Sequence, residues 1–258
     1  MLLGIDHIVI AVANLEAATK SYERLGFTVV PGGRHPVGTY NGLISLADGS
    51  YIELISFYRD NPQHRWWMPL QKGGGLVDFC IQTDDLVGDT SKLRNAGVHI
   101  DDPVPWSRTR PDGYQLKWLL SLAREGHRGV APFLIQDETP RDERVPRKKN
   151  HKNGVTGIGT VTVAVDDLQT VWHWYRSVLG LDGKPVRQDE IQAAGVRFQV
   201  GPHSFDFLEP AAKTGPLATW LNLRGPSPYT ATLLTKSQDS FPLDEKLTHG
   251  AALSLQQK

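Results

Sequence analysis

Residues 5–15 read IDHIVIAVANL, and the same pattern returns as VDFCIQTDDL at 77–86 and as IGTVTVAVDDL at 158–168. His7, Asp78 and Thr160 are taken as equivalent positions. A leucine follows eight residues later in each copy, and a glycine between apolar residues follows after nineteen or twenty: Leu15 and Gly26, Leu86 and Gly97, Leu168 and Gly180. A spacing of 70 to 80 residues is longer than the ~20–50 residues of a solenoid repeat. The pattern therefore indicates a supersecondary module that is used several times.

Each copy predicts a β-strand, a helix and further strands. β-branched residues build the first strand, and Asn14, Asp85 or Asp167 precedes a helix as its N-cap. The expected helices cover 16–25, 86–96 and 168–179, and each ends near its glycine. The expected later strands cover 28–30, 41–47 and 51–57, then 114–123 and 130–135 joined around Glu125–Gly126, then 195–200 and 204–208. The order is β-α-β-β-β, which predicts an α+β fold.

The repeats divide the chain into two parts. Residues 1–136 contain two modules, at 1–70 and 74–136. Residues 154–258 contain a third module at 154–210 and an incomplete fourth at 226–258, with expected strands at 229–235 and 251–255. Between these parts, 137–153 are rich in charge and proline and show no periodicity, which predicts a solvated linker.

The composition excludes several classes of protein. The 258 residues carry 28 Lys+Arg and 28 Asp+Glu, so the net charge of zero argues against nucleic-acid or membrane-surface binding. No apolar run approaches the ~20 residues of a membrane span, and the start of the chain lacks the basic region of a signal peptide. Cys80 is the only cysteine, which rules out internal disulfides. We expect a cytoplasmic protein.

A βαβββ module that opens with Asp6-His7-Ile8-Val9 and closes with Tyr51-Ile52-Glu53-Leu54 resembles the vicinal oxygen chelate superfamily, which includes glyoxalases, bleomycin-resistance proteins and extradiol dioxygenases. The chain is most similar to its glyoxalase-like domain proteins, whose motifs around Arg34-His35-Pro36 and His151-Lys152-Asn153-Gly154 it shares. This resemblance implies paired modules that form open, cup-shaped mixed sheets around a divalent metal.

The resemblance implies metal ligands on the first and last strand of each module. His7 and Glu53 hold those positions in module one, and imidazole with carboxylate suits Zn, Mn, Ni or Fe. Asp78 replaces the histidine of module two and is a third candidate ligand. Phe133 and Leu134 stand where a second glutamate is expected. In module three the pair is Thr160 and Asp206, a poor site for such metals.

Three functions remain open from the sequence. The first is a metal-dependent lyase or isomerase that acts on a small oxygen-chelating substrate through an enediolate-type intermediate. Its catalytic candidates are Glu53 and Asp78 as proton carriers, and His35 as the missing imidazole, a substrate contact or a proton carrier. The second is a non-catalytic small-molecule binding protein of the bleomycin-resistance type, which the altered second module favours. A scaffold that acts through a homodimer is a third possibility.

Charged and aromatic residues outside these motifs are ambiguous. Arg108, Arg110 and Lys117 lie on expected strands of module two, where they could bind an anionic substrate. Exposed strands, however, commonly carry such charges. Trp66 and Trp67 follow module one and fit either a substrate wall or an interface.

Overall fold

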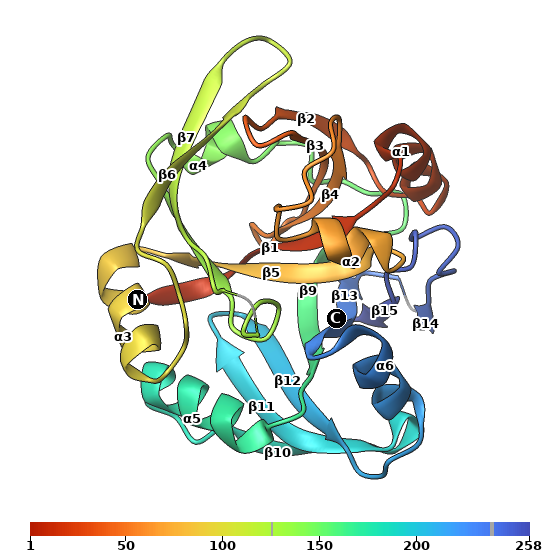
Figure 1. Cartoon of the computed structure of the whole chain (residues 1–258). Helices are drawn as coiled ribbons and strands as arrows, with labels where there is room; N and C mark the ends of the chain where they lie inside the picture. Colours follow the sequence, from red (N-terminus) through yellow and green to blue (C-terminus); the bar gives the residue numbers. More distant parts are fainter. Residues whose placement is uncertain (125, 238–239) are drawn as a thin grey trace.

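Two curled β-sheets form the body of the protein in the computed structural model, which describes residues 1–124, 126–237 and 240–258 (Figure 1). The first sheet is a closed barrel with the strand order β1-β4-β3-β2-β6-β7-β8-β5. Its elements are β1 (Leu2–Ala11), α1 (Leu15–Arg24), β2 (Val30–Arg34), β3 (Thr39–Ser45), β4 (Tyr51–Phe57), α2 (Trp67–Gln71), β5 (Gly75–Thr83), α3 (Leu86–Asn95), β6 (Val104–Thr109), β7 (Gln115–Ser121) and β8 (Phe133–Asp137).

The second sheet has seven strands in the order β10-β11-β12-β9-β13-β15-β14. A short helix, α4 (Arg141–Arg144), lies in the connection between the two sheets. The remaining elements are β9 (Val155–Ala164), α5 (Leu168–Leu179), β10 (Lys184–Gln188), the 3-10 turn Asp189–Ile191, β11 (Ala193–Val200), β12 (His203–Pro210), α6 (Pro216–Arg224), β13 (Ser227–Thr235), β14 (Phe241–Pro242) and β15 (Leu253–Gln257).

The three module helices begin where their capping residues predict. The side chains of Asn14, Asp85 and Asp167 accept hydrogen bonds from the backbone N–H three residues later. The helices start at Leu15, Leu86 and Leu168, and α5 ends with Gly180 in the left-handed conformation (φ 68°). These contacts satisfy backbone groups that a helix end leaves without partners, so the prediction of the caps is confirmed.

Strand alternation separates the barrel interior from the core between the sheets. On β1, Ile8 and Ile10 point outward into a large core that also contains the outer faces of β5, β9 and β12. Phe79 and Phe205 meet across that core, with ring centroids 5.1 Å apart. Val9 and Ala11 point into the barrel, where an apolar cluster includes Cys80, Trp118 and Phe133. The second sheet thus packs against the outer side of β1 and β5, and the interior of the barrel is separate from this core.

The α+β fold of βαβββ modules is confirmed, with differences of detail. The first sheet was expected to be open, but β2 and β6 join at the pair Arg34–Thr109 and close it. The segment 137–153 is not solvated throughout, because Arg144 and Val145 are buried. Helix α6 lies in a stretch that the repeats left unassigned. The expected turn around Glu125–Gly126 falls partly outside the described residues, and β8 begins at Phe133.

None of the helices in the described ranges is both long and apolar enough to cross a lipid bilayer.

Candidate functional site

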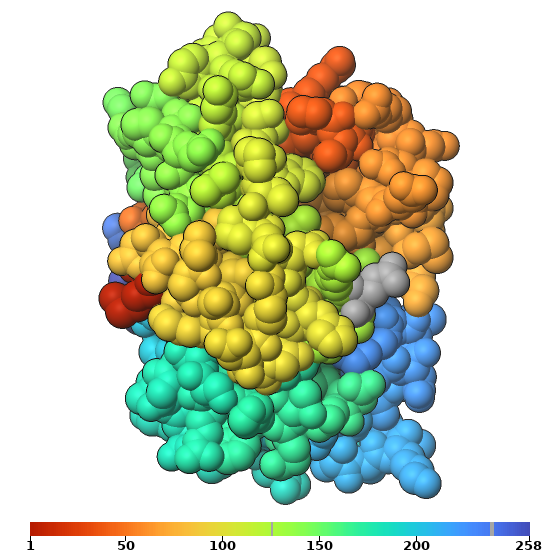
Figure 2. Space-filling model, turned by 60° about the vertical axis from the view of Figure 1, so that its left-hand side comes forward, coloured from red at the N-terminus to blue at the C-terminus, as the bar shows by residue number. Residues whose placement is uncertain are grey.

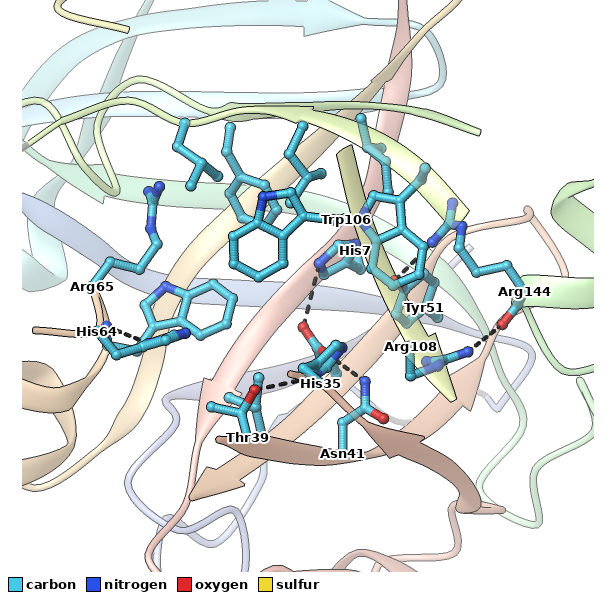
Figure 3. Close-up of a pocket in the computed structure, with 18 residues that line it drawn as sticks. His7, His35, Thr39, Asn41, Tyr51, His64, Arg65, Trp106, Arg108 and Arg144 are labelled. Carbon is cyan, nitrogen blue, oxygen red and sulfur yellow. Dashed lines mark hydrogen bonds and ion pairs between the residues drawn. The ribbon is translucent and has the colours of Figure 1, made fainter. Parts of the chain in front are cut away.

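A pocket occupies the interior of the barrel (Figure 3). The space inside it that is open to water-sized molecules is about 50 Å³, room for a few waters. Polar groups gather around His7, and apolar side chains from β6, β7 and β8 form the opposite wall. The lining residues are His7, His35, Thr39, Asn41, Tyr51, Glu53, Ile55, His64, Arg65, Trp66, Trp106, Arg108, Trp118, Leu120, Leu122, Phe133, Ile135 and Arg144.

His7 and Glu53 meet in this pocket because β1 and β4 are parallel neighbours. Val9 pairs with Glu53 and His7 pairs with Tyr51, so the two side chains project from adjacent strands toward the same space. His7 Nε2 lies 3.5 Å from Glu53 Oε2, and both residues are buried. Asn41 Nδ2 on β3 donates to Glu53 Oε1 at 2.5 Å. The sequence-predicted pair is therefore brought together with one carboxylate oxygen facing the imidazole.

Asp6 fixes the orientation of the His7 ring. A β-bulge between Ile5 and His7 disturbs the strand locally, and the consecutive side chains meet, with His7 Nδ1 2.7 Å from Asp6 Oδ1. Asp6 is fully buried and also binds Arg144, whose Nη2 lies 2.7 Å from Oδ2. An imidazole that donates a hydrogen bond from Nδ1 to a carboxylate is held in the tautomer whose Nε2 lone pair is free. In this site Nε2 faces Glu53.

The protonation states of this group follow from its contacts. Burial opposes ionisation of Glu53, but the contacts with His7 and Asn41 outweigh it and lower the pKa of Glu53 to about 2. Burial also opposes charge on His7, yet Asp6 and Glu53 raise the pKa of His7 above its ordinary value. Two carboxylates thus favour positive charge at His7, whether a proton or a metal ion supplies it.

His35 also lines the pocket, and its imidazole is neutral near pH 7. It follows the end of β2, and its Nδ1 lies 2.9 Å from Thr39 Oγ1. Burial, together with the charges of Arg108 and His7, lowers the pKa of His35 to about 4. His64 also lines the pocket, and burial with the charge of Arg65 lowers its pKa to about 4. The pocket therefore offers two imidazoles that are uncharged near neutral pH.

The structure does not bring Asp78 to the pocket wall. Asp78 is fully buried on β5, where it accepts hydrogen bonds from Arg65 Nε at 3.0 Å and from Trp66 Nε1 at 2.8 Å. Its carboxylate holds these two side chains, which themselves line the pocket. Phe133, the residue at the missing glutamate position, forms part of the apolar wall.

Several pocket residues were missed by the sequence reasoning or left ambiguous in it. Asn41 and His64 carried no signal beyond their residue type. Trp66 was ambiguous between a substrate wall and an interface, and it proves to be 8% exposed and part of the wall. Of the three basic strand residues, Arg108 lines the pocket and is buried, whereas Lys117 is exposed and Arg110 pairs with Asp112. Alternation would place Arg108 and Arg110 on the same face of a strand, and they differ because β6 ends at Thr109, a boundary that the sequence did not show.

Asp6, His7 and Cys80 form the one trio of His, Cys, Asp or Glu side chains, among the described residues, whose donor atoms all lie within 4.8 Å of one another. This trio is a poor metal site. Asp6 is already bonded to two arginines, Arg141 and Arg144. Burial raises the pKa of the Cys80 thiol well above its ordinary value, and metals bind the thiolate.

The matching positions of the second sheet are arranged differently. Asp206 on β12 is fully buried and accepts hydrogen bonds from Arg197 at 2.6 and 2.7 Å. Helix α6 lies over this face of the sheet, where Leu217, Trp220 and Leu221 pack against Ala164 and Leu208. The carboxylate is paired and the concave face is covered.

Comparisons with known proteins agree with this architecture. A family model described as a glyoxalase-like domain matches residues 5–179. A hypothetical protein from Staphylococcus aureus has a similar structure, with a TM-score of 0.72, 16% identity and full coverage of both chains. A triple mutant of 4-hydroxymandelate synthase from Streptomyces coelicolor has a TM-score of 0.60 and 15% identity, covering 92% of this chain and 72% of that one. At these identities the structural likeness shows the fold alone. No curated protein sequence matches the chain.

Proposed function

Since the chain belongs to the glyoxalase-like domain family of the vicinal oxygen chelate superfamily, we propose that it is a metal-dependent lyase or isomerase whose site is the barrel pocket. Its substrate is a small molecule with two neighbouring oxygens. The observation that carries the proposal is the buried His7–Glu53 pair, 3.5 Å apart and facing the pocket, with the His7 ring oriented by Asp6.

The donor set fits a divalent ion of the Zn, Mn, Ni or Fe type. Imidazole and carboxylate are the ligands that such ions accept, and the low pKa of Glu53 keeps its carboxylate ionised. The hydrogen bond to Asp6 holds the His7 tautomer whose Nε2 can bind a metal. Two protein ligands leave the other coordination positions to water and substrate, and open positions distinguish a catalytic from a structural metal site.

The residues around the pair have separate tasks in this proposal. A bound divalent ion would act as a Lewis acid that stabilises an enediolate-like oxyanion. His35 is the proton carrier, because it faces the same pocket and, with a pKa of about 4, is a stronger base than Glu53. Glu53 is better suited to be a ligand than a base, since a carboxylate with a pKa of about 2 accepts protons poorly. Asp78 positions Arg65 and Trp66.

The alternative is a non-catalytic small-molecule binding protein. It is favoured by module two, where Asp78 is paired with Arg65 and Phe133 replaces a ligand, so that one His–Glu pair remains. Such a protein would use the apolar wall to hold its ligand and would have no need of an ordered His7–Glu53 pair.

Metal content and turnover distinguish the two functions. We expect about one equivalent of metal per wild-type chain by elemental mass spectrometry after incubation with Zn, Mn, Ni or Fe. His7→Ala and Glu53→Gln should lose it, because each removes a ligand, while His173→Ala on the exposed face of α5 should retain it. The loaded protein should turn over adducts of α-ketoaldehydes with thiols or related hydroxyketones, and His35→Gln should lower kcat without removing metal. Equal metal content in wild type and His7→Ala would contradict the proposal.

A further inference from the structure

The pocket wall contains three arginines and one carboxylate, Glu53. Two of the arginines are neutralised by acids behind the wall. Arg65 Nη2 lies 2.8 Å from Asp78 Oδ2, and Arg144 binds both Asp6 and Asp137. The third arginine, Arg108, has no carboxylate within 4.0 Å among the described residues.

Arg108 is 3% exposed, so bulk water does not solvate its charge. Its Nη2 donates to the backbone oxygen of Arg144 at 2.9 Å. Its Nε is fully enclosed and, within the described part of the chain, has no hydrogen-bond acceptor. A buried charge without a counter-charge is costly, as is a buried donor without an acceptor. An anion that enters the pocket would supply the missing counter-charge.

Glu53 does not serve as this counter-charge. Its Oε1 accepts from Asn41 and its Oε2 faces His7. Asn41 also connects the two ends of the site. A Cβ placed on Gly32 would lie 2.0 Å from Asn41 Oδ1 and 3.1 Å from Arg108 Nη1. The Asn41 amide and the Arg108 guanidinium therefore both pack against the backbone at Gly32. Figure 3 shows Arg108 near Asn41 and Tyr51, within the polar half of the pocket.

We propose that Arg108 binds the carboxylate of the substrate, which makes the substrate class a small organic acid with an oxygen on the carbon next to its carboxylate. The neighbouring oxygen would reach the His7–Glu53 pair; only this end of the inference rests on the proposed function. A planar guanidinium matches the two oxygens of a carboxylate. The small pocket favours a carboxylate over the larger phosphate, and Trp106, Trp118 and Leu120 contact the rest of the molecule.

The matched ligands (S)-lactate and (S)-lactamide test this assignment, because they have nearly the same shape and differ in charge. Isothermal titration calorimetry of the zinc-loaded and the metal-free protein should show that lactate binds about tenfold or more tightly than lactamide, since a hydrogen bond to a charged group is worth at least that ratio. Arg108→Met should remove the preference, and Arg108→Lys should retain part of it. Arg110→Met, just beyond the end of β6 and outside the pocket wall, should behave like wild type, because Arg110 is already paired with Asp112.

The outcomes separate the two proposals. A lactate preference that Arg108→Met abolishes supports the inference even if His7→Ala leaves the metal content unchanged, in which case the metal function alone fails. Equal affinities for lactate and lactamide in wild type, no lactate binding, or a preference that survives in Arg108→Met would overturn it. Inorganic phosphate that binds more tightly than lactate and depends on Arg108 would overturn the assignment to a carboxylate. If Arg108→Met does not unfold cooperatively, wild type and Arg108→Lys decide the question.

Discussion

In the barrel, β1 and β4 carry His7 and Glu53 beside an open pocket, whereas in the second sheet the matching strands β9 and β12 carry Thr160 and Asp206 beneath a helix. Both pairs of strands are parallel neighbours with the same kind of register. The barrel fills its interior partly with side chains and leaves room around the polar pair. The second sheet covers its concave face with α6 and neutralises Asp206 with Arg197.

The module therefore provides two matching strand positions, while the surroundings of each copy determine what the residues there can do. Any curled sheet must cover its concave face, either with its own chain or with a ligand, because exposed apolar and polar groups there are costly. A helix placed over that face, as α6 is in Figure 1, leaves the sheet a structural role. Figure 2 shows the same division from another side, with the barrel elements above and the second half below. Substitutions in each half test this contrast.

The largest effect on stability is expected at the segment that joins the halves. Arg144 on α4 is 2% exposed and binds Asp6 and Asp137. Arg144→Met leaves Asp6 with fewer counter-charges in a buried place, which should lower the free energy of unfolding by about 3–5 kcal/mol. Chemical denaturation measures the loss.

A matched control lies three residues further along. Arg147 pairs with Asp142 at the surface, and its side chain is 82% exposed, so Arg147→Met should cost about 0–1 kcal/mol. Equal losses in the two variants would show that the Asp6 cluster contributes no more than a surface ion pair. The barrel site would then not depend on the connecting segment.

The sequence predicted the parts of the site that follow from strand periodicity. His7 and Glu53 lie at fixed places on the first and last strands, and alternation puts both inside the barrel. The Asp6–Arg144 contact joins residues 138 positions apart, and no periodicity in 137–153 pointed to it. Asp78 looked like a ligand because its position was equivalent to His7. Arg65, in an irregular segment, is the partner that the sequence could not provide.

Helix α6 had usable signals that the repeat pattern obscured. Pro216 stands in its first turn and Gly225 follows its last residue, the usual order of helix start and stop residues. Its apolar residues lack a clear single face, and the helix at the matching place after module one, α2, has only five residues. The sequence therefore did not show that α6 covers the second sheet. That depends on tertiary packing of Leu217 and Trp220 against Ala164 and Leu208.

The next effect is a decrease in the free energy of unfolding at acid pH, which we expect because the barrel pocket contains buried imidazoles. The pKa of His35 is lowered to about 4 in the folded protein, so the unfolded chain binds its proton first as the pH falls. Stability should therefore decrease between about pH 6.5 and about pH 4, by about 3 kcal/mol at most from this residue. Urea unfolding at pH 7.0 and pH 4.5 measures it.

His35→Gln isolates this contribution, because glutamine keeps a polar group near Thr39 without titrating. The variant should lose less stability than wild type between the two pH values. If wild type and variant showed the same decrease, the buried imidazole would not be the cause. His64, whose pKa is lowered in the same direction, accounts for part of what remains.

The smallest effect is expected at Asp206, and it tests the contrast between the halves directly. Asp206→Asn keeps the shape of a fully buried side chain but weakens its charge-assisted bonds to Arg197, whose side chain is 43% exposed and can turn to water. We expect a loss of about 1–2 kcal/mol in the free energy of unfolding and no change in metal content, whereas Glu53→Gln should lose the metal. The two carboxylates occupy matching strands, so the pair of variants compares one position in two surroundings. A loss of metal in Asp206→Asn would mean that the second half takes part in the site, and the assignment of chemistry to the barrel alone would have to be given up.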